Sequence, residues 1–440
     1  MKVTTLAPVG LALILLLTPA GTAMAADDEE KKDRDEPKVE ELERKVDVLA
    51  EEIERLRAGE GETSRSAATE DDEPLRLGLG PSASKVYGVS RGVSLGGYGE
   101  WLYQGPDGSL DDGTPSGAMK TADQLRFVLY TGYKFTDSIL LNTEVEFEHG
   151  TTDDEGEVSV EFAYLDFLIR PELNVRTGLV LVPVGLINET HEPTTFLGSR
   201  RPDVETSILP STWRELGAGV FGDVGPVSYR AFLTTSLDAA GFTADRGIRG
   251  GRQNGSEAVA EDLALSARVD YAGIPGLLVG VSGFRGDSGQ GQTVMGNTVA
   301  GTVTTTDVHA DYRWRALETR GVWARVEIDD AEAISALTGE TIGSTLRGWY
   351  LQAGYDVLAP TRFNSKQLIP FVRVESFDTQ SSVPAALAST VTGVNDRDVT
   401  TFGVVFRPIP QVAIKVDRQN DDNAAGTGLD QTNVAVGFSF

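Results

Sequence analysis

The side chains that could do chemistry gather in one stretch of the sequence, residues 183–214. Within it, carboxylates, a histidine, guanidinium groups and an indole alternate with apolar residues. The candidates are Asn188, Glu189, His191, Glu192, Arg200, Arg201, Trp213 and Arg214. A histidine beside carboxylates could bind a metal or act as a general base, and arginines could bind or select anions. The rest of the sequence must decide between these chemistries.

Catalysis and metal binding find little further support. The 440 residues include three histidines and no cysteine, so His191 lacks the organised set of ligands that a metal site needs. The sequence has no nucleophile elbow, P-loop or H-E-x-x-H motif. We therefore expect no enzyme, no metal and no cofactor, and interpret His191 as part of a hydrogen-bond network in its loop. A hydrolase using a serine or histidine inside the fold is kept as an alternative.

The segments on either side of this stretch follow a period of two. Between residues 93 and 440, sixteen segments alternate apolar with polar side chains, and most are close to the length of about 9–11 residues that crosses a membrane as a tilted strand. Short connections alternate with long ones, as in barrels of the outer membrane. The sequence predicts an all-β fold, a 16-stranded antiparallel transmembrane β-barrel, with both ends of the chain on the short-turn side.

A soluble β-sandwich would also alternate, so the membrane assignment needs separate support. Aromatic residues gather at the short-turn ends, and the last alternating segment ends on Phe440. Backbone groups in hydrocarbon must all be paired, and a closed barrel pairs them. The fourth segment deviates, because Asp166 shares a face with Phe162 and Tyr164. We expect a β-bulge or a protected subunit contact there.

Residues 183–214 form the longest interruption of this series. A loop of such length is uncommon unless it is functional or disordered, and the apolar anchors Phe196, Leu197 and Trp213 argue against disorder. A barrel of about sixteen strands is too wide for side chains to fill. We therefore predict that residues 183–214 fold into the barrel mouth as a constriction loop.

The N-terminal region carries different signals. Residues 1–25 have the basic start, apolar run and small-residue cleavage site of a secretory signal peptide. Residues 26–58 repeat apolar side chains at heptad spacing, which predicts a short α-helical coiled coil. An amphipathic helix lying on its own domain is the alternative. Residues 59–85 are expected to form a linker, and residues 86–440 the barrel.

The charges suggest which residues line the interior. A formal net charge of -27 argues against nucleic acid as a partner. The pore-lining candidates are Arg126, Glu144, Glu146, Glu148, Arg176, Arg230 and Arg373 on the strands, with Arg200, Arg201 and Arg214 in the loop. Our hypothesis is a transverse field, with Arg126 and the arginines of the loop facing the three glutamates of the third segment. The alternative for each residue is a solvated charge without a selective role.

Five short motifs carry a family resemblance. They are FAYLD (162–166), LVPVG (181–185), NETHEP (188–193), RRP (200–202) and PSTWRELG (210–217). They resemble those of the phosphate-selective porins O and P and their wider relatives. The resemblance covers residues 86–440 and implies a 16-stranded homotrimer in outer-membrane lipid, a third long loop that constricts the pore, and a coiled coil in the periplasm.

The resemblance also implies a function. Such porins pass small hydrophilic solutes or ions by passive diffusion, and anions such as phosphate are among the candidates here. The alternative function is structural: an outer-membrane tether that links the envelope through its coiled coil.

Overall fold

A computed structural model describes residues 79–151 and 156–440 of the chain. The chain divides into two units, Met1–Glu70 and Asp71–Phe440, and every described residue belongs to the second. The predicted signal peptide and coiled coil, and most of the predicted linker, lie outside the described residues.

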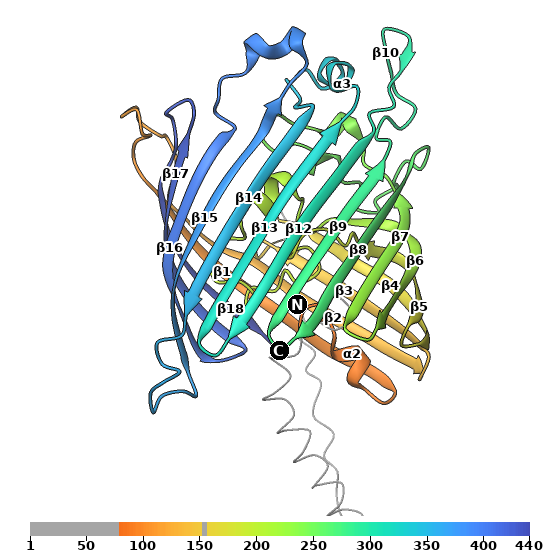
Figure 1. The fold of residues 1–440 in the computed structure, drawn as a ribbon, viewed down its shortest axis with the longest axis vertical. Helices are drawn as coiled ribbons and strands as arrows, with labels where there is room; N and C mark the ends of the chain where they lie inside the picture. The colour runs from red at the N-terminus through yellow and green to blue at the C-terminus, as the bar shows by residue number, and fades with distance from the viewer. Residues whose placement is uncertain (1–78, 152–155) are drawn as a thin grey trace, which may run out of the picture. The chain divides into compact units, whose positions relative to one another are not determined.

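Sixteen antiparallel strands form one closed barrel, which confirms the predicted fold class. Neighbours in the chain are neighbours in the barrel, β9 pairs with β12, and β18 closes the barrel on β1 (Figure 1). The strands are β1 (Gly92–Pro106), β2 (Thr121–Thr136), β3 (Ile139–Glu148), β4 (Val158–Arg170), β5 (Leu173–Leu181), β6 (Arg214–Val224), β7 (Val227–Thr235), β8 (Leu263–Ile274), β9 (Leu277–Gly286), β12 (Val303–Trp314), β13 (Leu317–Ile328), β14 (Thr345–Tyr355), β15 (Gln367–Ser382), β16 (Asp396–Ile409), β17 (Val412–Asn423) and β18 (Gln431–Ser439).

Short elements precede the barrel or lie in its long connections. They are α2 (Lys85–Gly88), η3 (Val204–Ile208), η4 (Ala239–Gly241), η5 (Arg249–Gly251), the hairpin of β10 (Thr293–Val294) and β11 (Asn297–Thr298), α3 (Ala331–Thr338) and η6 (Ala385–Thr390). In the part of the chain that the structure describes, no helix combines the length and the apolar character needed to span a membrane.

Alternation along β8 produces two contrasting surfaces. Leu263, Leu265 and Tyr271 point outward and are 52, 57 and 43% exposed. Arg268 and Asp270 point inward and are buried. Apolar side chains outside and charged ones inside reverse the arrangement of a water-soluble protein and match a strand that faces lipid.

A β-bulge resolves the anomaly of the fourth segment. The register of β3 and β4 shifts at Glu161, which is left as an extra residue between Val160 and Phe162. Beyond the bulge, Phe162, Tyr164 and Asp166 all face the interior and are buried. The expected bulge is therefore present, and Asp166 needs no protection from lipid because the aromatic residues beside it point inward as well.

Candidate functional site

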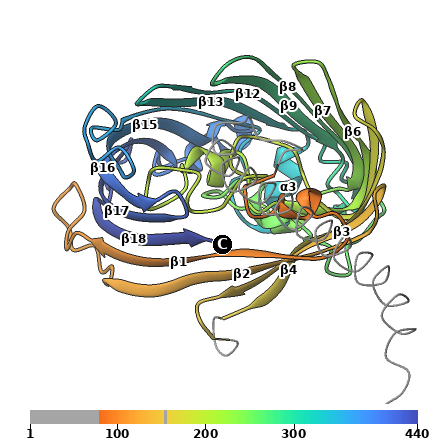
Figure 2. The same ribbon diagram turned by 90° about the horizontal axis from the view of Figure 1, so that it is seen from below.

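Residues 182–213 leave the end of β5, fold into the barrel interior and return to β6 (Figure 2). The loop reaches the far wall at β17, where Ser199 N donates to Asp417 Oδ2 at 2.6 Å. On the same strand, Lys415 Nζ donates to the carbonyl oxygens of Phe196 and Gly198 at 2.8 and 2.9 Å. The loop therefore crosses the lumen from one wall to the other.

Asn188 joins the two ends of this loop. Its Nδ2 donates to the carbonyl oxygens of Val182 and Trp213 at 2.7 and 2.9 Å, and its Oδ1 accepts from Trp213 N at 2.7 Å. The side chain is buried, so breaking these bonds would leave polar groups without partners. A single amide thus closes a loop of some thirty residues at its base.

Glu205 fixes the middle of the loop. Its Oε2 accepts from the backbone N–H groups of Leu186 and Ile187 at 2.7 and 2.6 Å, and its Oε1 accepts from the Tyr350 hydroxyl on β14 at 2.5 Å. Burial raises the pKa of this carboxyl group, while its hydrogen bonds act in the opposite direction. The loop is consequently attached to the barrel wall by a fully buried contact.

One face of the loop is apolar and packs on the inner wall. Trp213 is fully buried, with its ring centroid 4.6 Å from that of Phe284 on β9. Val204 and Ile208 of η3 belong to the same buried cluster, as does Phe377 of β15. A wide barrel normally has a polar interior. Here the apolar part of the wall is covered by the loop, which gives the loop a hydrophobic core of its own.

The opposite face of the loop is polar and meets the wall of β1 to β3. His191 Nε2 lies 3.1 Å from Glu144 Oε1. Beside it, Arg126 lies 3.2 Å from Glu146 and 3.4 Å from Glu100. All of these side chains are buried or nearly so. His191 is thus part of a hydrogen-bond network, and no group of three or more metal-binding side chains occurs among the described residues.

Three arginines converge on Ser211, near the end of the loop. Arg249 Nη1 and Arg252 Nη1 donate to the Ser211 carbonyl oxygen at 3.0 and 2.7 Å. Arg201 Nη1 lies 3.4 Å from Ser211 Oγ. A fourth, Arg214, also lies beside this turn. We call Arg201, Arg214, Arg249 and Arg252 the arginine cluster.

The arginine cluster contains more guanidinium groups than ion pairs. Arg214 pairs with Glu161 at 2.5 Å, but Arg201, Arg249 and Arg252 form no ion pair within the described residues. Burial and the neighbouring cations, Arg252 first, lower the pKa of Arg249 to about 8. Burial lowers the pKa of Arg252 to about 10. Burial is the largest cause of both shifts, and the carboxylates of Glu161 and Glu215 oppose it at Arg252.

Arg249 and Arg252 were not among the residues predicted from sequence. They belong to the connection between β7 and β8, which also enters the interior around η5. The motif RGIRGGR at residues 246–252, three arginines within seven residues, was the signal that could have singled them out.

Several predicted lining residues are neutralised on the wall itself. Their ion pairs are Arg176 with Asp166 at 2.8 Å, Arg373 with Glu375 at 2.6 Å, and Arg230 with Glu189 at 3.1 Å and Asp270 at 2.7 Å. All of these side chains are buried. They form a scaffold of paired charges, and Glu189 attaches the loop to it.

The predicted transverse field is arranged differently in the structure. Arg126 lies on the same wall as Glu146 and pairs with it instead of facing it across the lumen. Arg200 lies on the far side, 3.5 Å from Gln419 of β17, with a side chain that is 39% exposed. Glu148, at the end of β3, is half-buried. Of the loop arginines, Arg214 pairs with Glu161 of β4, and Arg201 lies near Glu146 of β3. Arg249 and Arg252, which the sequence analysis did not single out, contact Ser211 together with Arg201.

The segment just before β1 is also anchored inside the barrel. Glu192 Oε1 accepts from the backbone N–H groups of Ser82 and Ala83 at 2.8 and 3.2 Å. Burial raises the pKa of Glu192 to about 7 despite these bonds. The Tyr87 hydroxyl donates to Asp166 Oδ2 at 2.6 Å. Residues 79–88 therefore form a strap between the barrel wall and residues 182–213.

Solved structures share this architecture. The outer membrane channel DcaP of Acinetobacter baumannii is 14% identical, with 82% of this chain and 100% of that chain covered and a TM-score of 0.52. A loop L8 deletion mutant of OmpT, an outer membrane protein of Vibrio cholerae, is 11% identical, with 80% and 100% covered and a TM-score of 0.51. The chain thus shares the closed β-barrel fold of these two outer-membrane proteins.

Another protein is more similar to this chain in sequence than these two structures are. An uncharacterized protein of Aquifex aeolicus (strain VF5) is 35% identical over 382 residues, which are 82% of this chain and 83% of that protein. The chain belongs to the same family as this Aquifex protein. No protein-family model matches the sequence.

Proposed function

We propose that the protein is an outer-membrane porin that passes small hydrophilic solutes by passive diffusion and favours anions such as phosphate. The observation that carries the proposal is the arginine cluster, in which Arg201, Arg249 and Arg252 have no ion pair within the described residues. It lies inside a barrel whose outer face is apolar. Unpaired cations in a restricted aqueous space attract and concentrate anions.

The position of the cluster supports this function. Two inward loops supply it, and one of them crosses the whole lumen, so a solute traversing the barrel has to pass close to it. The wall beside the cluster contains Glu144, whose Oε2 is buried and has no hydrogen-bond partner among the described residues. Buried charged atoms of this kind require water or a solute as a partner. Both observations favour a hydrated passage between the polar face of the loop and β1 to β3.

Two further proposals concern assembly and location. The structurally similar DcaP is an outer membrane channel, and the motif resemblance to phosphate-selective porins implies a homotrimer. We place the protein in the outer membrane as a homotrimer, with its N-terminal region in the periplasm. Membrane fractionation and the mass of the native assembly in detergent test these assignments.

The selectivity proposal is tested by reversal potentials in planar bilayers under a salt gradient. We expect wild type to be anion-selective, and Arg249→Gln with Arg252→Gln to shift the reversal potential towards cation selectivity. Glutamine retains a donor for the Ser211 carbonyl oxygen, and the paired Lys variants keep the charge and should retain wild-type selectivity. Arg246→Gln is the matched control, because Arg246 lies in the same loop and its side chain is 68% exposed. A double Gln variant with an unchanged reversal potential would remove the cluster from the selectivity mechanism.

A further inference from the structure

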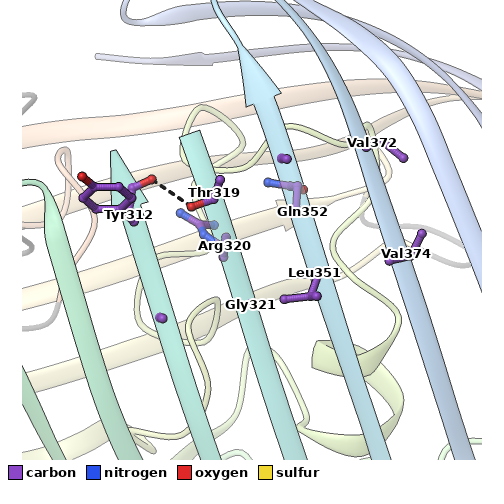
Figure 3. Close-up of a pocket in the computed structure, with 10 residues that line it drawn as sticks. Tyr312, Thr319, Arg320, Gly321, Leu351, Gln352, Val372 and Val374 are labelled. Atoms are coloured by element: carbon purple, nitrogen blue, oxygen red, sulfur yellow. Dashed lines mark hydrogen bonds between the residues drawn. The ribbon is translucent and has the colours of Figure 1, made fainter. Parts of the chain in front are cut away.

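The outer face of β12 to β15 contains an apolar hollow. Its lining includes the small residues Ala310, Gly321 and Ala353 and the larger Leu351 and Val374. Gly321, Leu351 and Val374 are labelled in Figure 3. The volume of about 430 Å³ is within the range of about 300–1,000 Å³ that is typical of ligand sites. These side chains alternate with the inward ones, so the hollow opens on the outside of the barrel and not into the lumen.

A pair of arginines lies above this hollow on the same outward face. Arg325 of β13 and Arg347 of β14 are directly opposite each other in the strand register, and both are exposed. Two residues towards the hollow, Trp323 and Trp349 form the neighbouring cross-strand pair and are 45 and 41% exposed. Tryptophan is enriched at membrane–water interfaces, so the arginines stand at headgroup level.

The charges of this pair are poorly compensated. Like charges directly opposite each other destabilise a sheet. Arg325 pairs with Glu327 at 2.7 Å, whereas Arg347 has no hydrogen bond or ion pair within the described residues. Asp378 lies opposite Arg347 in the register of β15 and attracts it, but the two side chains form no ion pair within the described residues. An anionic ligand would relieve the repulsion.

Another outward arginine shows what compensation looks like in this barrel. Arg418 of β17 lies 2.6 Å from Asp107 and 3.0 Å from Asp430. Its charge is thus neutralised by two carboxylates of the protein. The contrast with Arg418 indicates that outward arginines of this barrel are not generally left without carboxylate partners.

We propose that this face binds a phosphorylated lipid of the outer leaflet, with the phosphate on Arg325 and Arg347 and an acyl chain in the hollow. The inference rests on the proposed outer-membrane location. Gly321 and Arg325 are four residues apart on β13, or about 13 Å along the strand, so one lipid molecule can reach both sites. Arginine suits phosphate because its planar group donates two parallel hydrogen bonds.

Native mass spectrometry of the detergent-solubilised protein, titrated with lipid A, tests the proposal. We expect Arg325→Gln with Arg347→Gln to weaken lipid A binding by roughly 10- to 30-fold. Gly321→Leu should weaken it independently by filling the hollow, since the added side chain displaces the flexible end of Leu351. Arg418→Gln is the matched control and should bind lipid A as wild type does.

Three other outcomes would overturn the inference. Unchanged lipid A affinity in both variants would exclude the site. Equal affinity for inorganic phosphate would mean that the site takes a free ion. A change in the number of subunits would mean that the face holds a second copy of the chain. Conductance measured on the same preparations separates this test from that of the porin proposal, because the outward variants should conduct as wild type does, and a wild type without conductance would contradict the porin proposal alone.

Discussion

The two faces of residues 182–213 meet opposite walls of the barrel through different physical forces. One face carries Trp213 into a buried apolar cluster shared with β9, β14 and β15. The other carries His191 to Glu144 and lies beside Arg249 and Arg252. Apolar burial depends little on a specific partner, whereas charge placement decides which solutes are attracted. The comparison suggests that one face holds the loop in place and the other acts on what passes.

The contrast also explains why the loop needs no lid-like movement to restrict the lumen. Asn188 and Glu205 bond the loop to itself and to Tyr350, and the apolar face gives it a core. A loop fixed in this way can hold guanidinium groups in a defined geometry. Guanidinium groups that are held in place before a solute arrives do not have to rearrange when it passes, so no free energy is lost to reorganisation.

The largest expected effect comes from breaking the apolar face. Trp213→Ala removes a fully buried side chain that packs on Phe284, and we expect a loss of about 3–5 kcal/mol in the free energy of unfolding. Single-channel recordings should also show a larger and noisier conductance, because the loop loses its anchor. Denaturant unfolding in detergent gives the energy. Trp323→Ala, outward-facing and 45% exposed, is the control. Equal stability losses in the two variants would show that the apolar face is no special anchor.

A smaller effect is expected from the strap on the polar side. Burial raises the pKa of Glu192 from 4.5 to about 7, so the folded state holds a proton that the unfolded chain releases between these values. The free energy of unfolding of wild type, relative to Glu192→Gln, should therefore fall as pH rises from 4.5 through 7, by roughly 3 kcal/mol in total.

Unfolding curves of both proteins, collected across this pH range, check the prediction. Glutamine does not titrate and can still accept from the N–H groups of Ser82 and Ala83, so it isolates the effect of the proton. A difference between the two proteins that is constant with pH would mean that Glu192 is not buried by the strap.

The smallest effect concerns one hydroxyl of the strap. The Tyr87 hydroxyl donates to Asp166 and accepts from Arg176 Nη2 at 3.0 Å. Tyr87→Phe should cost about 1–2 kcal/mol in unfolding free energy, since it removes two hydrogen bonds to charged groups. Tyr103→Phe on the outer face of β1, 38% exposed, is the control and should be near neutral. A neutral Tyr87→Phe variant would indicate that the strap is held by its apolar contacts alone.

The barrel could be predicted because its cause is local and repeated. Most strands alternate throughout, as β8 does, and loop length alternates too, so strand number and closure follow from the sequence. The bulge at Glu161 could be suspected from Asp166, because one inserted residue reverses the parity of everything after it. The sequence alone could not show whether the side chains of Phe162 and Tyr164 point into the barrel or out of it, and the structure shows that they point inward.

The candidate site was less accessible to sequence reasoning. Residues 183–214 stood out by length and composition, but the partners of each charge depend on contacts across the barrel. Arg126 shows this, since no local pattern reveals that it would pair with Glu146 on its own wall. Arg249 and Arg252 come from another loop, and their distance from Ser211 is a property of two loops folding together.

The central claim is that the polar side of the lumen is a hydrated, anion-favouring passage. Single-channel recording of purified wild type in a planar bilayer, with a salt gradient across it, tests this claim most directly. The account predicts discrete conductance steps whose reversal potential has the sign of an anion-selective pore. Bilayers that hold the inserted protein and yet show no steps, or steps that reverse at the cation potential, would contradict it.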